Sequence, residues 1–321
     1  MQHSNILVIG GAGFIGRHIV ARLTARGLRV TVPTRRRARA RHLIMLPTID
    51  VVECDVHDDA VLGNLMRDKD AVINLIGILH GSHGSPYGPE FARSHVELPR
   101  RIVAACLTHG VRRLLHMSAL GADSRAPSMY QRSKGDGEAV VQASQLDWTI
   151  FRPSVVFGPE DNFLNMFATL AKFFPMLPIG SADARFQPVW VGNVADAFVN
   201  ALDKRETFER TYELAGPQIY RLRDLVAFAA AASGNPRRVF GLPDALARVQ
   251  ATLMELAPGE PLMSRDNLDS MKVDNVTAEQ PFRPAPELGI SMTPMEAEAP
   301  TYLSRAHARS RFGFYRARAG R

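Results

Sequence analysis

Apolar residues in the first half of the chain follow two alternating spacings. Short continuous apolar runs, typical of strands buried on both faces, occur at 5–9, 28–32, 49–54, 71–76, 111–117 and 148–151. Between these runs, apolar residues recur at helical spacing in 17–27, 58–66, 89–109 and 129–144. Six strands joined by helical crossovers predict an α/β fold with a doubly wound parallel sheet.

The pattern changes after residue 153, where Pro and Gly interrupt shorter elements. We expect helices at 162–174, 193–202, 222–232 and 244–256, and short strands at 185–191 and 211–214. The chain beyond residue 256 is expected to be irregular. The sequence therefore predicts a sheet domain at 1–153, a smaller α+β lobe at 154–304 interleaved with it over its cleft, and a flexible basic tail at 305–321.

A glycine-rich turn joins the first predicted strand to the first helix, with Gly10, Gly13 and Gly16 spaced as G-x-x-G-x-x-G. Positive φ at Gly10 would permit a tight turn, and bare backbone at Gly13 would let a pyrophosphate approach. Gly16 would let the helix pack closely on the strand. Because helix N-termini bind anions, this turn predicts that residues 1–153 form a Rossmann dinucleotide-binding domain.

The residue at the end of the second strand indicates which dinucleotide is bound. NAD-binding chains carry an acid there for the ribose 2'-hydroxyl, whereas this chain has Arg35 within a basic cluster. Guanidinium groups suit a 2'-phosphate, so NADP(H) is favoured over NAD(H). For Arg39 and Arg41, the alternative is a solvated basic face.

Ser118, Tyr130 and Lys134 are the candidate catalytic residues. Tyr130 and Lys134 lie four apart on a predicted helix, so they project from one face about 6 Å apart along the axis. The ammonium would lower the pKa of the phenol and could hydrogen-bond the nicotinamide ribose. Ser118, at the end of the fifth strand, could polarise a carbonyl. The set predicts hydride transfer to a carbonyl or from an alcohol, although a surface lysine on an amphipathic helix is the alternative.

Two further features have structural alternatives. His80 and His83 lie in a turn-rich loop at 80–89, where they either meet a substrate or are solvated. The apolar stripe of 162–174 either lines a cleft for an apolar or quinone-like substrate or forms ordinary core.

Composition narrows the class of protein. The apolar fraction of 46% indicates a folded chain, and the two cysteines show neither metal-ligand spacing nor a disulfide framework, so no metal site is expected. The net charge of +7 includes a basic tail that is interleaved with aromatic residues. This tail could hold an anionic membrane surface or an acidic partner, or simply be solvated. No nucleic-acid partner is expected, because no such module accompanies it.

The start of the chain bears on localisation. Met1–Ser4 lead directly into the first strand, which leaves no room for a targeting segment, and no apolar stretch reaches the length of a membrane span. We therefore expect a cytoplasmic protein that can lie peripherally at the inner face of the membrane.

Three motifs together resemble a known superfamily. Gly10-x-x-Gly13-x-x-Gly16, Tyr130-x-x-x-Lys134 and Arg152-Pro153 are similar to those of the extended and atypical short-chain dehydrogenase/reductases, a Rossmann superfamily that includes nucleotide-sugar epimerases and dehydratases. More narrowly, 118–122, 130–138, 152–161 and 188–196 resemble the NAD(P)H-binding accessory subunit of respiratory complex I and its bacterial relatives.

The resemblance, carried over position by position, implies a set of cofactor contacts. These are Gly10, Gly13, Phe14, Ile15 and Gly16 for the pyrophosphate, Arg35 and Arg36 for the 2'-phosphate, Asp55 and Val56 for the adenine, Leu75, Ile76 and Gly77 for the ribose side, and Lys134, Pro153 and Val156 for the nicotinamide.

The resemblance leaves three functions open. The first is an NADP(H)-dependent oxidoreductase, linked to ubiquinone or to complex I. The second is a non-catalytic, membrane-peripheral accessory or assembly protein that binds NADPH. The third is a nucleotide-sugar epimerase or dehydratase, which the segment at Ser118 disfavours because it lacks the Ser-Ser-x-x-Val-Tyr-Gly form of those enzymes.

Overall fold

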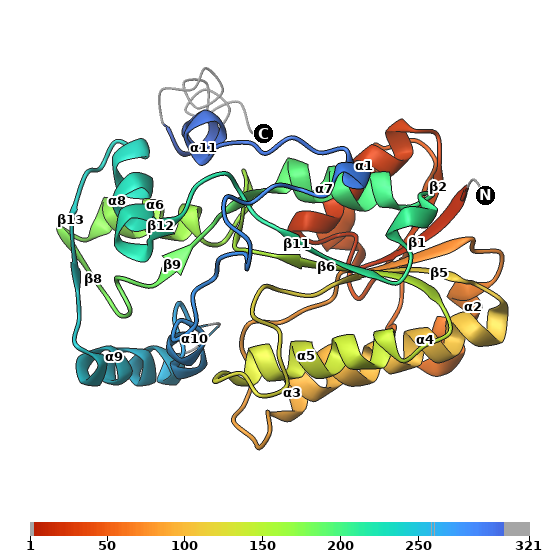
Figure 1. The fold of residues 1–321 in the computed structure, drawn as a ribbon, viewed down its shortest axis with the longest axis horizontal. Coiled ribbons are helices and arrows are strands. Elements are labelled where there is room, and N and C mark those ends of the chain that lie inside the picture. The colour runs from red at the N-terminus through yellow and green to blue at the C-terminus, as the bar shows by residue number, and fades with distance from the viewer. Residues whose placement is uncertain (1–2, 258, 260, 305–321) are drawn as a thin grey trace.

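The computed structural model describes residues 3–257, 259 and 261–304 (Figure 1). The predicted tail at 305–321 lies outside these residues. Seven strands form one parallel sheet in the order β3-β2-β1-β4-β5-β6-β11. They are β1 (Asn5–Ile9), β2 (Arg29–Thr34), β3 (Ile49–Glu53), β4 (Ala71–Asn74), β5 (Arg113–Met117), β6 (Asp147–Pro153) and β11 (Arg210–Leu214). The strand order reverses between β1 and β4, and ligands of such sheets bind at the carboxyl ends of the strands beside this point.

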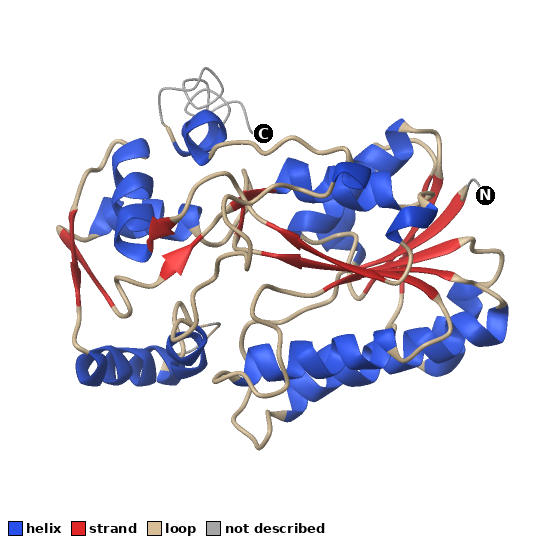
Figure 2. Cartoon of the chain, in the orientation of Figure 1, coloured by secondary structure: helices blue, strands red, loops and turns tan. Residues whose placement is uncertain are grey.

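Helices cover both faces of the sheet (Figures 1 and 2). One layer contains α1 (Phe14–Ala25), the short helix η1 (Arg37–Leu43) and α7 (Val191–Ala201), and the other contains α2 (Asp59–Met66), α4 (Leu98–His109) and α5 (Met129–Gln142). Alternate residues of β1 enter the two layers, since Ile6 and Val8 pack with the first and Leu7 and Ile9 with the second. This explains the continuous apolar run, and the predicted doubly wound α/β class is confirmed.

The segment predicted as a single helix over 89–109 is helical throughout but changes its winding. α3 (Pro89–Phe91) continues through a π-helical stretch, η2 (Ala92–Glu97), into α4. Pro99 has no N–H with which to bond the preceding turn, and wider turns of this kind often accompany such a defect and mark functional sites. The π-helical stretch contains the buried residue His95.

The predicted number of six strands is wrong. The sequence places 211–214 in the smaller lobe, but β11 pairs with β6 in parallel from Arg210 opposite Thr149 to Leu214 opposite Pro153. The preceding helix α7 likewise packs on α1 of the sheet domain. β11 is an edge strand and therefore carries alternating polar and apolar residues. In the sequence, this pattern is similar to that of the short strands of the lobe.

The smaller lobe is built from short elements around a core of its own. They are β7 (Val156–Phe157), α6 (Leu164–Phe173), β8 (Met176–Ile179), β9 (Arg185–Phe186), β10 (Val189–Trp190), β12 (Tyr220–Arg221), α8 (Leu222–Ala232), β13 (Arg238–Gly241), α9 (Asp244–Leu256), α10 (Arg265–Ser270) and α11 (Met295–Leu303). The expectation of an irregular chain beyond 256 is wrong, because α10 and α11 form there. α10 begins with a capping box between Ser264 and Asn267.

The apolar stripe of 162–174 is ordinary core over most of its length. Phe167 is buried, and Phe163, Met166 and Leu170 pack against the same lobe core. Phe173 and Phe174 are the exceptions, since they are 77% and 52% exposed at the end of α6. The stripe therefore does not supply the lining of an apolar cleft.

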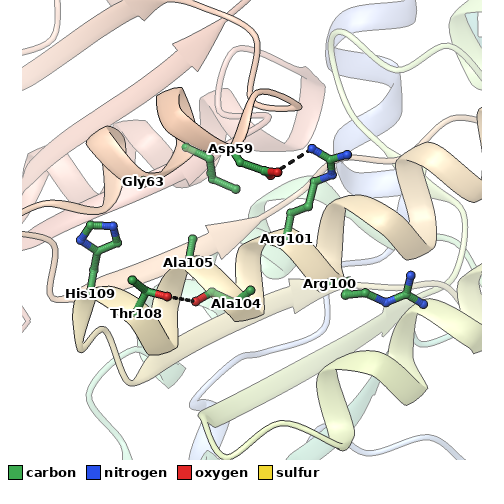
Figure 3. Close-up of a pocket in the computed structure, with 9 residues that line it drawn as sticks. Asp59, Gly63, Arg100, Arg101, Ala104, Ala105, Thr108 and His109 are labelled. Atoms are coloured by element: carbon green, nitrogen blue, oxygen red, sulfur yellow. Dashed lines mark hydrogen bonds and ion pairs between the residues drawn. The ribbon is translucent and has the colours of Figure 1, made fainter.

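A groove of about 320 Å³ separates α2 from α4 (Figure 3). Arg101 lines it and bonds Asp59, at 2.9 Å, across the groove. The groove contains none of the predicted site residues. Among the described residues, no helix has the length and apolar character needed to cross a membrane.

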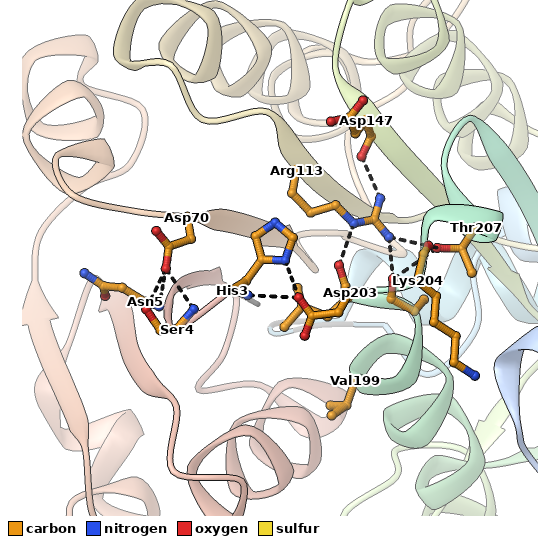
Figure 4. A network of polar contacts seen from close by, with 12 residues as sticks. His3, Ser4, Asn5, Asp70, Arg113, Asp147, Val199, Asp203, Lys204 and Thr207 are labelled. Atoms are coloured by element: carbon orange, nitrogen blue, oxygen red, sulfur yellow. Dashed lines mark hydrogen bonds and ion pairs between the residues drawn. The ribbon is translucent and has the colours of Figure 1, made fainter. Parts of the chain in front are cut away.

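A buried arginine joins the sheet to its covering helices (Figure 4). Arg113, 1% exposed on β5, donates to the carbonyl oxygens of Leu202 and Ala201 at the end of α7 and to that of Asp147 on β6. A cation is favourable at the C-terminus of a helix, and these bonds satisfy carbonyls that the helix leaves without partners. The network thus holds α7 on the sheet domain.

Candidate functional site

The glycine turn has the geometry that the sequence predicts. Gly10 has φ +86°, and a Cβ atom at Gly16 would lie 2.4 Å from the Gly10 carbonyl oxygen, so a side chain there would require the turn to move. Gly13 is the N-cap of α1, and this helix starts with neither a side-chain cap nor an acid in its first turn. Its first N–H groups are therefore available to an anion.

The turn that follows β4 lies against the glycine turn that follows β1. Leu75 N–H donates to the Ile9 carbonyl, and a Cβ atom at Gly10 would lie 3.2 Å from the Leu75 carbonyl carbon. Farther along this turn, a Cβ atom at Gly77 would lie 3.1 Å from Lys134 Nζ. The residues predicted for the pyrophosphate and for the ribose therefore lie on adjoining turns.

Lys134 is buried at the carboxyl end of β5. It is 4% exposed, and its Nζ donates to the Met117 carbonyl at 3.1 Å. Burial lowers the pKa of Lys134 to about 8, with the nearby Glu138 carboxylate opposing the shift. A lysine in this position can change charge near neutral pH when a ligand enters.

Tyr130 differs from the expectation in its ionisation. Its ring lies against that of His95, with centroids 5.7 Å apart, and against Phe91 at 6.5 Å. Burial raises the pKa of Tyr130 to about 12, so the prediction that Lys134 lowers this pKa is wrong. The Lys134 ammonium bonds the Met117 carbonyl instead, so desolvation of the phenolate prevails. Tyr130 is thus a phenol at neutral pH, able to donate a proton.

Ser118 has an unsatisfied hydroxyl. The residue is 3% exposed, and its Oγ atom is buried without a hydrogen-bond partner in the part of the chain that the structure describes. Its N–H donates to the Phe151 carbonyl, which keeps Ser118 in line with the end of β5. A buried hydroxyl without a partner is uncommon and indicates a place where a ligand or water oxygen binds.

Two buried histidines lie beside this set and were not found from the sequence. His95 Nε2 accepts from the Ile78 N–H at 3.0 Å, and its Nδ1 lies 2.8 Å from Ser133 Oγ. His116 Nδ1 accepts from Asn74 Nδ2 at 3.1 Å. The usable signal was a histidine inside an apolar strand.

Both histidines are neutral for the same physical reasons. Burial, assisted by the positive charge of Lys134, lowers the pKa of His116 to about 3 and that of His95 well below its ordinary value. The two imidazoles therefore bring hydrogen-bonding groups next to Lys134 without adding positive charge.

The Arg152-Pro153 motif fixes α5, the helix that carries Tyr130 and Lys134. Arg152 on β6 makes a bidentate ion pair with Glu138 of α5, whose carboxylate is 2% exposed. Such a fork positions α5 over the sheet. Pro153 and Val156 follow at the carboxyl end of β6, where the Pro153 carbonyl accepts from Leu120 N–H and Val156 pairs with Val189 on β10.

The predicted adenine end is polar and exposed. Arg35 and Arg36 are exposed at the end of β2. Asp55 accepts from the His57 N–H at 3.0 Å and pairs with Arg93 at 3.6 Å. Val56 packs on the layer that contains α2. The Asp55–Arg93 pair had no local sequence signal, because its partners are far apart in the chain.

His80 and His83 line a second cavity, of about 340 Å³, between their loop and the segment that joins α9 to α10. Glu90, Glu255 and Ser264 complete its polar lining. Arg265 lies 2.8 Å from His83 Nε2 and also pairs with Glu255. Neither Tyr130 nor Lys134 lines this cavity.

Comparison with known proteins agrees with this geometry. Residues 6–215 match the model of the NAD dependent epimerase/dehydratase family. The chain belongs to this family. The predicted resemblance to epimerase- and dehydratase-like short-chain dehydrogenase/reductases is confirmed. Membership also supports the binding of a nicotinamide dinucleotide.

The relatives that resemble this chain include both a respiratory-chain subunit and a reductase. Subunit 9 of the NADH dehydrogenase [ubiquinone] 1 alpha subcomplex from Rattus norvegicus mitochondria is 30% identical over 304 residues, which are 93% of this chain and 79% of the relative. A ceramide reductase from Caulobacter vibrioides is 27% identical over 246 residues, or 74% of each chain.

A solved family structure shows the same fold. DesIV, a dTDP-glucose 4,6-dehydratase from Streptomyces venezuelae with NAD and TYD bound, superposes with a TM-score of 0.65 at 22% identity, covering 74% of this chain and 85% of that chain.

Proposed function

We propose that this family member is an NADP(H)-dependent oxidoreductase that reduces a carbonyl compound to an alcohol. The observation that carries the proposal is the unpartnered, buried hydroxyl of Ser118, at the end of the strand that also supplies the carbonyl bonded by Lys134. Bound NADPH would supply the hydride that the carbonyl carbon accepts. Ser118 would donate a hydrogen bond to the carbonyl oxygen and hold it for reaction.

Tyr130 would supply the proton. Its pKa of about 12 keeps it protonated at neutral pH, so it can donate to the oxygen as negative charge develops there. Lys134 would bond the ribose, and the transient phenolate would regain its proton from solvent. Each product alcohol then contains one hydride and one proton, which balances the reduction.

The cofactor contacts are proposed residue by residue. Gly10, Gly13 and the first turn of α1 would hold the pyrophosphate, and Arg35 with Arg36 would hold the 2'-phosphate of NADP(H). The remaining predicted contacts are Phe14, Ile15, Gly16, Asp55, Val56, Leu75, Ile76, Gly77, Pro153 and Val156.

The experiment is a hydride-transfer assay with NADPH against a panel of carbonyl and quinone compounds. We expect turnover that Tyr130→Phe abolishes while NADPH binding persists. Tyr212→Phe is the matched control, because it removes a tyrosine hydroxyl bonded to Glu287, outside the Ser118–Lys134 set. If no compound is turned over, or if Tyr130→Phe and Tyr212→Phe behave alike, the proposed reaction is wrong.

Cofactor choice is tested separately. Arg35→Ala should weaken NADPH binding much more than NADH binding, because only NADPH has the 2'-phosphate. Arg39→Ala, an exposed arginine from the same cluster, is the control and should change neither affinity. Equal losses for both nucleotides would refute the preference for NADP(H).

A second candidate function is a non-catalytic accessory or assembly protein. It is favoured by the likeness to the rat subunit over 93% of this chain. A ligand that binds only the native state stabilises it by about 4 kcal/mol at a thousandfold excess over Kd, so NADPH need not turn over to matter. Purified protein that retains NADPH through gel filtration without reducing any compound would favour this function.

The remaining predictions concern partners and place. An apolar or quinone-like substrate belongs to the oxidoreductase function, and a nucleotide-sugar epimerase or dehydratase remains the third alternative. We expect the protein to be cytoplasmic. Its basic tail would bind an anionic membrane surface or an acidic partner protein. Deletion of 305–321 followed by cell fractionation tests this role, because unchanged fractionation would exclude the tail as an anchor.

A further inference from the structure

One end of the smaller lobe exposes a concentration of apolar side chains. Three segments contribute to it: the end of α6, the two-stranded ribbon β8/β13 at the left edge of Figure 1, and α9, which lies below the ribbon. They supply eight of the fifteen large apolar side chains that are exposed in the described part of the chain. These eight form the lobe-end surface: Phe173, Phe174, Met176, Phe240, Leu246, Val249, Leu253 and Leu256.

α9 is apolar on two opposite sides. Ala247 and Ala251 are buried, and pack with Leu268 of α10. On the other side, Leu246, Val249, Leu253 and Leu256 recur at helical spacing and are 56% to 78% exposed. This stripe extends about 15 Å along the helix. A helix that has already buried one apolar face, and exposes a second, has a surface suited to another apolar phase.

The ribbon continues the same surface. In the β8/β13 register, Met176 pairs with Arg238 and Pro178 with Phe240, so these four residues share the outer face. The inner face carries Leu177, Ile179 and Val239, which pack into the lobe core. α9 follows the ribbon directly, since the Leu242 N–H donates to the Ile179 carbonyl at 2.8 Å.

The charges at this surface are mostly positive. Lys172 precedes Phe173 at the end of α6, and Arg238 lies on the outer face of the ribbon. Both are exposed, and neither forms an ion pair with any residue of the described chain. α9 carries two acids, Asp244 at its start and Glu255 near its end, and Glu255 is already paired with Arg265. An apolar stripe beside unneutralised cations suits an anionic lipid surface.

The chain end belongs to the same lobe. α11 packs against α6 and α8, and Tyr302 donates to Asp161 at 2.9 Å. The described chain stops one residue after this helix, at Ser304. The following 17 residues contain six arginines and no acid. The sequence that continues from the folded lobe is therefore strongly basic.

We infer that the lobe-end surface docks on an anionic lipid bilayer, with the apolar stripe of α9 entering the interface and Lys172 and Arg238 facing the headgroups. A second copy of the chain suits this surface less well. A twofold contact would present Lys172 and Arg238 to a surface that is itself mostly positive, whereas anionic headgroups would neutralise them. This inference goes beyond the proposed reaction and does not depend on it, because the surface lies outside the Ser118–Lys134 set.

The test is sedimentation of the full chain with vesicles of phosphatidylcholine, with and without phosphatidylglycerol. We expect binding to the anionic vesicles, weakened at least about tenfold by Leu253→Glu, since a largely exposed leucine would lose its insertion. Leu107→Glu is the matched control, because Leu107 is an equally apolar, 50% exposed helix residue on α4. It should retain wild-type binding, and circular dichroism should show both variants folded.

Two further measurements separate the sources of binding. The loss caused by Leu253→Glu should persist in a chain lacking 305–321, which excludes the tail as the sole anchor. Lys172→Glu combined with Arg238→Glu should weaken anionic binding alone. Equal binding by wild type and Leu253→Glu, or equal loss with Leu107→Glu, would overturn the inference. A lipid-free dimer that Leu253→Glu dissociates would overturn it too, because a second copy would then cover the surface.

Discussion

The carboxylate of Asp266 accepts a hydrogen bond from the backbone N–H of Tyr130 at 3.1 Å, across 136 residues of sequence. The same carboxylate accepts from the Met129 N–H at 2.6 Å and is 6% exposed. Asp266 lies on α10, so the C-terminal part of the chain caps the helix that carries Tyr130 and Lys134. Negative charge at a helix N-terminus is stabilising, and more so when it is buried.

Removing this cap should destabilise the fold. We expect Asp266→Ala to lower the free energy of unfolding by about 1–2 kcal/mol, measured by urea denaturation, because two buried N–H groups lose their acceptor. Asp59→Ala, which removes an exposed acid from the first turn of α2, should lower it by less than about 1 kcal/mol. If both variants lowered the free energy of unfolding equally, the buried Asp266 cap would stabilise the fold no more than an exposed acid does.

Lys134 should make NADPH binding depend on pH. The ammonium form can bond the ribose, and its pKa in the free protein is about 8. Binding therefore favours the protonated form, and the affinity should fall by up to about tenfold per pH unit above that pKa. Fluorescence titration with NADPH at several pH values measures this dependence.

The same titration on two variants gives the control. Lys134→Met should bind more weakly and lose the pH dependence. Lys69→Met should keep it, because Lys69 is a partly buried lysine at the amino end of the sheet, where it bonds Asn5 and Thr31. Loss of the pH dependence in Lys69→Met would rule out Lys134 as its source.

His116 should make the fold sensitive to acid. The unfolded imidazole takes up a proton near pH 6.5, whereas the folded one remains neutral down to its pKa of about 3. The unfolded state binds more protons between these values, so stability falls as pH falls through this window, by up to about 1.4 kcal/mol per pH unit. Urea denaturation across this range should show a smaller slope for His116→Asn, and an identical slope would contradict the assignment.

Gly137 should tolerate no side chain. A Cβ atom there would lie 2.0 Å from the backbone carbonyl oxygen of His95, so α5 and the π-helical stretch would have to separate. We expect Gly137→Ala to lower the melting temperature and to cost about 1–3 kcal/mol. Gly63→Ala is the control, because its Cβ atom would meet only the His109 side chain, at 3.2 Å, within a helix that alanine favours.

The sheet and the glycine turn could be predicted because their signals are local. Each strand from β1 to β6 is an apolar run, and Gly10, Gly13 and Gly16 are spaced within a single turn. β11 could not be assigned to the sheet in this way, because its pairing with β6 is set by a partner about sixty residues earlier.

In the candidate site, too, only the features with a local sequence signal could be predicted. Tyr130 and Lys134 share a helix face and were found by spacing. His95, Asp266 and the unpartnered state of Ser118 depend on contacts between distant elements, which have no periodic signature. The ionisation of Tyr130 could not be read from its proximity to Lys134, because burial decides it.

The late return of β11 has a consequence for biosynthesis. When the ribosome has made β6, the outer edge of that strand has no neighbour until residues 210–214 emerge, after much of the smaller lobe. An unpaired parallel edge can capture foreign strands. The lobe cannot cover that edge in this interval, because α8 and α11, which complete its core, follow β11 in the chain. A stalled translation product that ends before β11 would therefore be aggregation-prone.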